Sequence, residues 1–392
     1  MSQSHGVLLT GTTGALGPAL AAELLVSEPK RNLSILIRAG NSSVTERFNE
    51  WTDAVTQVFI EQQNRMLQPK NWRARVTPVC GDVGTDNLGL DRETYDQLLK
   101  NTSIVVHAAA DTQFLGSSED QRNINVEGTR RMLEFARNCK SLDRMIQVST
   151  VCTSGTRLGL IEEKPLLNPP GFVNNYERTK WEAEQLALAT DLPLGIARVS
   201  IVIGAHASGY VHRLGAFHNL LKWFARGFVP VIPGTETTEV DLVSTEIVTQ
   251  FLAKAVSAKW DSHSIWQVAA GDQAALLPEI CSTVWGEVRP GQAVVSLEPG
   301  GGPFILDQAT FDQVRASKTR PRDRIVRQAL DSINSFLPML LYPRKYQTSN
   351  AERLWGGTLP WPDWRQTLIR VMKSCGFCPS DIRAPKPALS AA

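Results

Sequence analysis

A tyrosine and a lysine, Tyr176 and Lys180, stand four residues apart in a stretch whose composition predicts a helix. Residues at this spacing share one helix face, so the phenol and the ammonium group would lie together. A free phenol has a pKa of about 10, but a neighbouring cation favours the phenolate and lowers that value. Tyr176 could then give a proton to a carbonyl oxygen, which a hydroxyl such as that of Thr150 could hold by a hydrogen bond. The alternative interpretation is a Tyr–Lys pair on the surface of an amphipathic helix.

Three glycines near the start of the chain have the spacing of a phosphate-binding turn. They lie in the sequence Thr-Gly-Thr-Thr-Gly-Ala-Leu-Gly, between a predicted buried strand at 7–9 and a predicted helix at 15–27. Such a unit lets the backbone approach a pyrophosphate at a helix N-terminus, whose free N–H groups attract an anion. We therefore expect a bound dinucleotide; the alternative is a glycine-rich turn with no ligand. The expected contacts come from Gly11, Thr13, Gly14, Ala15, Leu16 and Gly17.

The end of the second predicted strand, at 33–38, indicates which dinucleotide is bound. A carboxylate here would hold both ribose hydroxyls of NAD, whereas an arginine favours the 2′-phosphate of NADP. Arg38 is followed by Ala-Gly-Asn-Ser-Ser, without an acid. We expect Arg38 to bind the 2′-phosphate, the alternative being a solvated strand-end cation. Arg47 could add a second charge-assisted contact, and the predicted cofactor is NADP(H).

Two further strand ends contribute to the predicted cofactor site. Asp82 and Val83 follow a strand at 75–80, where the carboxylate would accept a hydrogen bond from the adenine amino group, or would simply form a turn. Ala108, Ala109 and Ala110 follow a strand at 103–107 and leave room for the cofactor's ribose and pyrophosphate.

Two polar residues near these strand ends have predicted roles within the fold. His107 ends the fourth predicted strand, and we expect it to be structural rather than catalytic. Asn125 opens a predicted helix, as a cap or as a polar group inside the fold.

Strands and helices alternate over about 270 residues, which predicts an α/β fold with a Rossmann-like, doubly wound parallel sheet. The fifth strand, at 144–149, leads into Thr150, and ligands bind these sheets at the C-terminal ends of central strands. A helix at 245–257 and a seventh strand at 265–268 complete the alternation.

The predicted domain organisation follows from where the alternation stops. We expect residues 1–205 to form the NAD(P)-binding Rossmann domain, completed by 240–270. A smaller, mostly helical C-terminal substrate-binding region would comprise 206–239 and 271–385, and 386–392 would be a disordered tail. The late tryptophans Trp355, Trp361 and Trp364 could shape an apolar pocket, although we favour simple packing.

Composition limits the remaining possibilities. The chain has 392 residues, 42% of them hydrophobic and 20% charged, and a net charge of +2, which is ordinary for a soluble globular protein and gives no argument for a nucleic-acid partner. We see no signal peptide and no apolar stretch long enough for a transmembrane segment. Six scattered cysteines fit reduced thiols in the cytoplasm. Cys375 and Cys378 form a lone C-x-x-C, so we expect no metal site.

These motifs together resemble an extended short-chain dehydrogenase/reductase. The residues that carry the resemblance are the glycine turn at 10–17, Asp82-Val83, His107 to Ala110, Asn125, Ser149-Thr150 and Tyr176 to Lys180. The chain is more closely similar to the branch of thioester reductase domains and fatty acyl-CoA reductases. That likeness lies in Leu36-Ile-Arg38 with a helical insert after it, Gly81-Asp-Val leading to Leu88-Gly-Leu, Tyr176-x-x-Thr-Lys-Trp-x-x-Glu184, and Val240-Asp-Leu-Val-Ser244. It covers about residues 5 to 270.

The resemblance implies an NADPH-dependent enzyme with Thr150, Tyr176 and Lys180 as catalytic residues and Asn125 supporting Lys180 through water. It implies reduction of an acyl thioester carried by coenzyme A or by an acyl or peptidyl carrier protein. Hydride attack on the carbonyl would give a hemithioacetal, which collapses to an aldehyde and a thiol. A second hydride would give the alcohol.

Two positions depart from the pattern of this branch, and other functions compete. Asn175 stands where many relatives have Gly, and Val199 where many have Pro, which could change the substrate floor and the substrate loop. One alternative is an alcohol dehydrogenase or ketone reductase acting on a sterol, terpenoid or flavonoid. Another is a non-catalytic NADP(H)-sensing protein, although such relatives usually lack the Tyr–Lys pair. A sugar-nucleotide epimerase fits Arg38 less well, and a sugar dehydratase would have Asp-Glu after Thr150.

Overall fold

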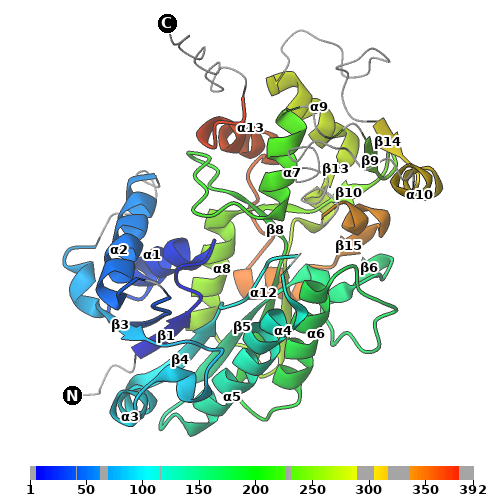
Figure 1. Ribbon diagram of the computed structural model, residues 1–392. Coiled ribbons are helices and arrows are strands. Elements are labelled where there is room, and N and C mark those ends of the chain that lie inside the picture. Colours follow the sequence, from blue (N-terminus) through cyan, green and yellow to red (C-terminus); the bar gives the residue numbers. More distant parts are fainter. Residues whose placement is uncertain are drawn as a thin grey trace, which may run out of the picture.

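A computed structural model of the chain describes residues 6–40, 42–61, 69–114, 116–226, 229, 231–288, 304–316 and 336–378 (Figure 1). The disordered tail expected at 386–392 lies outside the described residues. The helical insert after Leu36-Ile-Arg38 is predicted from the sequence to run from Val44 to Met66; its described part is α2 (Val44–Glu61), and residues 62–66 lie outside the described residues.

A parallel sheet of seven strands lies at the centre of the part of the chain up to residue 268, with the order β12-β7-β5-β4-β1-β2-β3. This arrangement confirms the predicted Rossmann-like, doubly wound fold. Neighbouring strands are paired in parallel throughout. The strands are β1 (Gly6–Thr10), β2 (Leu33–Ile37), β3 (Val76–Cys80), β4 (Thr102–His107), β5 (Arg144–Thr150), β7 (Leu194–Val199) and β12 (Ser264–Val268).

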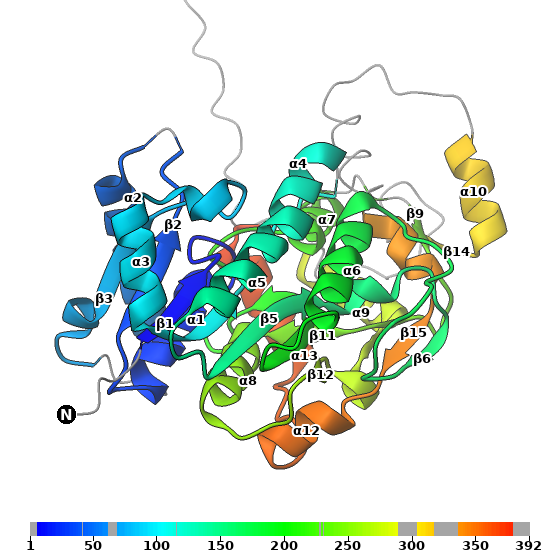
Figure 2. The ribbon, with the colours of Figure 1, turned by 90° about the horizontal axis from the view of Figure 1, so that it is seen from below.

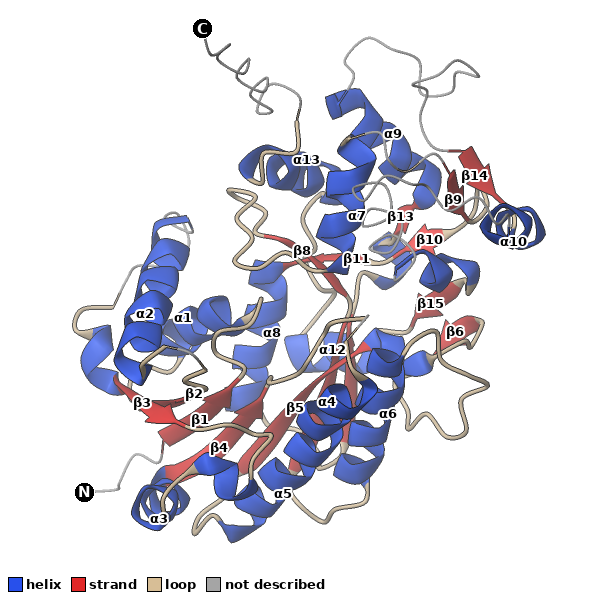
Figure 3. Cartoon of the chain, in the orientation of Figure 1, coloured by secondary structure: helices blue, strands red, loops and turns tan. Residues whose placement is uncertain are grey.

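Helices cover both faces of this sheet (Figure 3). One face carries α1 (Gly17–Ser27), α2 and α8 (Thr245–Ser257), and the other carries α3 (Arg92–Asn101), α5 (Gly128–Asn138) and α6 (Asn175–Leu188). Successive side chains of a strand point to opposite faces, so Leu9 packs among α1, α2 and α8, whereas Leu8 packs among α3, α5 and α6. The sheet is therefore buried on both sides, as its continuous apolar strands require.

A second apolar core lies beyond the C-terminal ends of the strands. It is formed mainly by α7 (Ala216–Ala225), α9 (Leu277–Val288), the short helix η6 (Leu337–Leu341) and α13 (Trp364–Ser374). Small two-stranded sheets border it: β9 (Val231–Pro233) with β14 (Phe304–Leu306), β10 (Glu239–Val240) with β13 (Ala275–Leu276), β11 (Leu242–Ser244) with β8 (Ile201–Gly204), and β15 (Arg344–Tyr346) with β6 (Gly159–Ile161). The remaining described helix of this region is α10 (Gln308–Ala316).

A late segment of the chain packs against the apolar cluster between the sheet and helices α1, α2 and α8, which we call the first core. Helix α12 (Ser349–Trp355) packs against β12 and α8 (Figure 2), and Ala351 and Leu359 are buried in the cluster that covers the sheet. Trp355 and Trp361 pack against the same cluster, and the Trp361 indole donates to the carbonyl oxygen of Ala269 at 2.9 Å. These late tryptophans pack, as favoured from the sequence, and residues 349–361 contribute to the core that covers the seven-stranded sheet.

Two buried carboxylates explain part of this packing. Glu163 accepts hydrogen bonds from the backbone N–H groups of Gln267 and Ala351, and so joins β12 to α12. Asp241 accepts from the N–H groups of Ala270 and Gly271, at 2.8 and 2.9 Å. The acid in Val240-Asp-Leu-Val-Ser244 therefore holds the turn after β12.

Candidate functional site

The glycine turn between β1 and α1 is packed too tightly for side chains at two of its glycines. A Cβ on Gly11, whose φ is +72°, would lie 2.4 Å from the backbone of Ala108, and one on Gly17 would lie 2.0 Å from the carbonyl oxygen of Thr12. The contact at Gly11 places the turn against the residue that follows β4, and the contact at Gly17 lies within the turn itself. The turn therefore lies beside the three alanines that follow β4, as expected for two parts of one cofactor site. These alanines, Ala108, Ala109 and Ala110, are partly exposed.

The start of α1 has the features of an anion site. Its N-cap residue, Leu16, makes no side-chain cap hydrogen bond, and its first turn contains no acid. Helix N-termini carry partial positive charge and unpaired N–H groups, which suit a phosphate. Arg47 of α2 adds a cation, because its guanidinium donates to the Thr13 hydroxyl at 3.4 Å. The residues of the turn therefore fit a pyrophosphate.

Arg38 and Asp82 lie together at the ends of β2 and β3. Their side chains form an ion pair of 3.8 Å, and 65% of the Arg38 side chain is exposed. Asp82 also accepts a hydrogen bond from the N–H of Gly84 at 2.8 Å, which is the turn-forming role considered above, while Val83 is buried. Arg38 thus keeps an accessible guanidinium at the edge of the sheet where the predicted adenosine end of the cofactor would lie.

Thr150, Tyr176 and Lys180 come together at the C-terminal end of β5. Thr150 ends the strand, and Tyr176 and Lys180 lie in the first turns of α6, which is capped by the Asn174 side chain accepting from the Glu177 N–H at 2.9 Å. The Thr150 and Tyr176 side chains are hydrogen-bonded. The Lys180 ammonium donates to the carbonyl oxygen of Val148 at 2.9 Å.

Burial determines how these two groups ionise. It raises the pKa of the Tyr176 phenol above its ordinary value, and the hydrogen bond from Thr150 offsets only part of this. It lowers the pKa of Lys180 to about 8, although Glu184 acts in the opposite direction. We expected Lys180 to lower the pKa of Tyr176, whereas the structure shows a net rise because the phenolate loses its hydration on burial. Tyr176 is therefore protonated at neutral pH, which is the form that donates a proton.

Asn125 is buried in a π-helical turn, Asn123–Glu127. Its side-chain oxygen accepts from the Asp111 N–H at 2.8 Å, and its amide donates to the Asp111 carbonyl and to the Thr179 hydroxyl, both at 3.0 Å. The side chain thus connects the loop after β4 to α6. A contact to Lys180 through water stays a prediction.

His107 is buried within a hydrogen-bonded chain. The Thr129 hydroxyl donates to the Asn125 carbonyl oxygen at 2.7 Å, so toward His107 Nε2 it can only accept. His107 Nδ1 is therefore the acceptor of the Thr10 hydroxyl at 2.7 Å, and that hydroxyl also accepts from the Ala109 N–H at 3.1 Å. His107 Nε2 then carries the proton and faces the Thr129 hydroxyl at 3.4 Å. Burial, with Lys180 nearby, lowers the pKa of His107 to about 3, so the ring is neutral. This environment fits the structural role expected from the sequence.

A buried ion pair behind the site was not identified from the sequence. Arg198 of β7 and Glu184 of α6 are both fully buried, with 2.8 Å between Nη2 and Oε2. The Ser149 hydroxyl donates to Glu184 at 2.5 Å, and Arg198 donates to the Lys164 carbonyl oxygen at 3.1 Å. Two sequence features could have indicated this ion pair: an arginine inside an apolar strand, and a glutamate one helical turn after Lys180.

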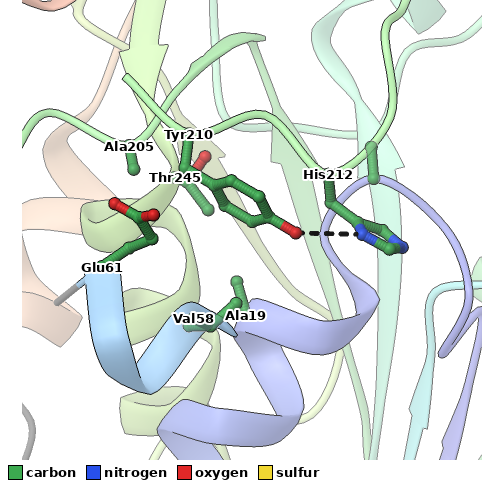
Figure 4. A pocket seen from close by; sticks show the side chains of 8 residues that line it. Ala19, Val58, Glu61, Ala205, Tyr210, His212 and Thr245 are labelled. Carbon is green, nitrogen blue, oxygen red and sulfur yellow. Dashed lines mark hydrogen bonds between the residues drawn. The ribbon is translucent and has the colours of Figure 1, made fainter. Parts of the chain in front are cut away.

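A small pocket lies beside the start of α1 (Figure 4). Ala19 of α1 and Val58 and Glu61 of α2 line one side, and Tyr210 and His212 line the other. The Tyr210 hydroxyl and His212 Nδ1 are 3.4 Å apart and hydrogen-bonded. The loop after β8 therefore covers the helices that follow the glycine turn.

The geometry agrees with the comparisons with known proteins. A model of the NAD-binding family described as Male sterility protein matches residues 9–252. A Drosophila melanogaster protein provisionally assigned as a fatty acyl-CoA reductase is 30% identical over 231 residues, which are 51% of this chain and 44% of the relative. The isonitrile lipopeptide synthase of Streptomyces coeruleorubidus is 28% identical over 250 residues, 62% of this chain and 16% of that protein. The chain thus spans less than half the length of these curated relatives.

A solved structure confirms the fold over almost the whole chain. The terminal R domain of the myxalamid PKS-NRPS biosynthetic pathway superposes with a TM-score of 0.77 at 22% identity, covering 98% of this chain and 94% of that domain. Among the described residues, no helix combines the length and the apolar character that crossing a bilayer requires, and no group of three or more His, Cys, Asp or Glu side chains is placed to hold a metal ion.

Proposed function

We propose that this chain, which belongs to the NAD-binding Male sterility protein family, is an NADPH-dependent reductase of acyl thioesters. The observation that carries the proposal is the placement of Thr150, Tyr176 and Lys180 at the end of β5, next to the strand ends that adjoin the glycine turn. Coenzyme A or a carrier protein would bear the acyl group, and the first product would be an aldehyde.

The cofactor is a nicotinamide dinucleotide, and we propose NADP(H). The start of α1 and Arg47 would hold the pyrophosphate, and the accessible guanidinium of Arg38 would bind the 2′-phosphate. Asp82 stands beside Arg38 and could accept from the adenine amino group, and Ala108 to Ala110 would lie against the ribose. When bound, the reduced nicotinamide supplies a hydride.

Side chains of the protein would bind and protonate the carbonyl oxygen. The protonated Tyr176 phenol would donate its proton to that oxygen, and Thr150 would hold the oxygen by a second hydrogen bond. Lys180, whose pKa is lowered to about 8, would bind the ribose and supply positive charge near the phenol. Cleavage of the carbon–sulfur bond then releases the aldehyde and a thiol, so one hydride and one proton are consumed for each thioester.

The thioester assignment is supported by what the relatives are named for. One is assigned as a fatty acyl-CoA reductase and another is a lipopeptide synthase. The family model matches the segment that contains the glycine turn and Tyr176. We further propose that 206–239 and 271–385 bind the substrate. None of the six cysteines, all of which lie in the described part of the chain, forms a disulfide, which fits our proposal of a reducing, cytoplasmic environment.

The test is to follow NADPH oxidation and thiol release by the purified protein. The substrates are acyl-coenzyme A thioesters together with matched aldehydes and ketones. We expect thioester-dependent NADPH oxidation with release of one thiol per aldehyde formed. Oxidation of NADPH with ketones alone would overturn the thioester assignment and indicate an alcohol dehydrogenase or ketone reductase. NADPH binding without turnover of any substrate would indicate a sensor.

A further inference from the structure

The loop between β8 and α7, residues 205–215, reaches the glycine turn of the cofactor site. Tyr210 and His212 of this loop line one hollow together with Ala15, an exposed residue of the turn, and Ala19 of α1. Figure 4 shows the His212 ring beside the segment that leads into α1. A side chain far from the turn in the sequence therefore lies where the pyrophosphate of the cofactor would bind.

The partly exposed ring of His212 can donate a hydrogen bond from Nε2. Burial and the nearby Glu61 raise the pKa of Tyr210, so its phenol keeps the proton, and His212 Nδ1 is the acceptor at 3.4 Å. Burial and Arg213 lower the pKa of His212, so its ring is neutral at pH 7 and carries its single proton on Nε2. Among the described residues Nε2 has no hydrogen-bond partner, so it is left to donate to a ligand.

Helix α13 fixes the position of this loop. Gly209 packs so closely on α13 that a Cβ would lie 2.3 Å from the carbonyl oxygen of Arg370. The Arg370 guanidinium donates to the carbonyl oxygen of His206 at 2.7 Å and to its Nε2 at 3.2 Å. The Thr367 hydroxyl, which donates to the Asp363 carbonyl oxygen, accepts from His206 Nδ1 at 2.7 Å. The loop is therefore held by backbone packing and by hydrogen bonds, all to one helix.

We propose that His212 is a further cofactor-binding residue, which donates from Nε2 to the pyrophosphate of the dinucleotide, and that α13 holds it there through residues 205–212. The N–H groups at the start of α1 would bind the anion from one side and His212 from the other. The inference rests on the proposed cofactor and adds a residue from a stretch predicted to bind substrate. It does not depend on the thioester, and its test measures binding alone.

The test is calorimetric titration of the protein with NADPH, NADH and adenosine 2′-monophosphate. His212→Ala should raise the Kd for NADPH and that for NADH about tenfold each, because both carry the pyrophosphate. Adenosine 2′-monophosphate has no pyrophosphate and should bind wild type and variant equally. His212→Gln should change the Kd for NADPH less than about threefold, since the amide can donate from a similar position. The matched control, His263→Ala, alters a histidine that precedes β12 at the other end of the sheet and should leave every Kd unchanged.

The role of α13 is tested by Arg370→Met, which removes the hydrogen bonds to His206. This variant should raise the Kd for NADPH about threefold. The double variant Arg370→Met/His212→Ala should bind NADPH no more weakly than His212→Ala alone, because Arg370 acts through His212. Arg365→Met is the control, since Arg365 lies on the same helix but pairs with Glu279.

The possible outcomes separate the inference from the proposed function. An unchanged Kd for NADPH in His212→Ala would overturn the inference and leave the proposed function standing. A loss that extended to adenosine 2′-monophosphate would also overturn it, because the whole cofactor site would then be disturbed. Additive losses in the double variant would overturn the role of α13. Failure of the wild type to bind either dinucleotide would overturn the proposed cofactor and the inference with it.

Discussion

Tyr176 is set to act as a proton donor by its surroundings rather than by its own acidity. Its ring packs against Phe114, with centroids 5.5 Å apart, and burial raises its pKa. The proton is therefore present at neutral pH, and the phenol is hydrogen-bonded to the Thr150 hydroxyl at the end of β5. A group of this kind contributes to the rate only when an oxygen accepts its proton in the transition state.

Removal of the Tyr176 hydroxyl should slow turnover without affecting the cofactor site. We expect Tyr176→Phe to lower kcat about 10²- to 10⁴-fold, the usual contribution of a positioned acid, with little change in the Kd for NADPH. Steady-state kinetics and fluorescence titration measure the two quantities. Tyr95→Phe is the matched control, because Tyr95 of α3 packs on Phe135 of α5 and is not part of the group formed by Thr150, Tyr176 and Lys180. Equal turnover in Tyr176→Phe and wild type would contradict the proposed mechanism.

Arg38 should determine the preference between the two dinucleotides. Its guanidinium is mostly exposed at the end of β2, and a charged hydrogen bond to a phosphate contributes about 1.5–3 kcal/mol. Arg38→Ala should therefore raise the Kd for NADPH about 10- to 100-fold and change that for NADH little. The control is Arg92→Ala, which removes an exposed arginine at the start of α3. Equal losses for both dinucleotides would show that Arg38 does not read the 2′-phosphate.

Glu177 should make stability depend on pH. This carboxyl is fully buried next to Tyr176, and burial raises its pKa from 4.5 to about 7, while the Val173 N–H and Arg344 act in the opposite direction. Between these two values the folded protein holds a proton that the unfolded chain releases, so stability falls as the pH rises from 4.5 to 7. Relative to Glu177→Gln, the wild type should lose on the order of 3 kcal/mol over this range. Urea unfolding at several pH values measures the difference, and parallel pH profiles for the two proteins would refute it.

At the scale of elements, the helix that carries Tyr176 and Lys180 is fixed from behind. Glu184 of α6 and Arg198 of β7 form a fully buried pair, and Ser149 of β5 donates to the same carboxylate. The contacts of Glu184 to β7 and β5 thus fix the position of α6, and with it the positions of Tyr176 and Lys180. A buried pair of this kind is destabilising to break, because the remaining charge has no partner.

Arg198→Met should therefore lower the free energy of unfolding by about 3–5 kcal/mol. The double variant Arg198→Met/Glu184→Leu should recover part of this loss, because it leaves no uncompensated charge. Chemical denaturation of the two variants tests both statements. Arg130→Met, which removes half of the exposed pair with Glu127 on α5, should cost no more than about 1 kcal/mol. A loss for Arg198→Met as small as that control would argue against the pair as the anchor of α6.

Regular elements of this chain could be predicted because their patterns are local. The helix expected at 245–257 has those bounds in the structure, and the strands of the sheet agree within a residue or so. The π-helical turn at Asn123–Glu127 could not be predicted, since it depends on Asn125 finding Asp111 and Thr179. The partner of Lys180, a backbone carbonyl of β5, is also set by tertiary packing.

At the scale of the whole molecule, the chain's two cores meet at the site. The first core packs against the sheet and adjoins the glycine turn, and the second core lies beyond the strand ends. The sequence predicts that 206–239 and the residues after about 271 lie outside the Rossmann alternation, and this division stays a prediction. It did not show that 349–361 return to the first core, because the burial of Ala351 and Leu359 depends on contacts with α8 and β12.

Arg344 links the short helix η6 to the residues that follow Thr150. Its guanidinium donates to the Ser154 hydroxyl and the Gly155 carbonyl on one side, at 3.1 and 2.6 Å, and to the Met339 carbonyl of η6 on the other, at 3.3 Å. Arg344→Met should release η6 and raise the KM for an acyl thioester about tenfold, since such charged hydrogen bonds contribute about 1.5–3 kcal/mol each. The Kd for NADPH should stay the same, because the glycine turn lies in the other core. A parallel rise in both constants would point to general unfolding instead.

The return of α12 to the sheet has a consequence for how the chain acquires its structure during translation. Strand β12 and helix α8 leave the ribosome with an apolar surface that Ala351 and Leu359 later cover. Domains generally fold as units from the N-terminus as they are synthesised, but this one lacks part of its covering until about ninety residues after β12 have been made. A nascent chain stalled before residue 349 should therefore bind a chaperone that recognises exposed apolar surface, and one stalled well beyond 361 should release it.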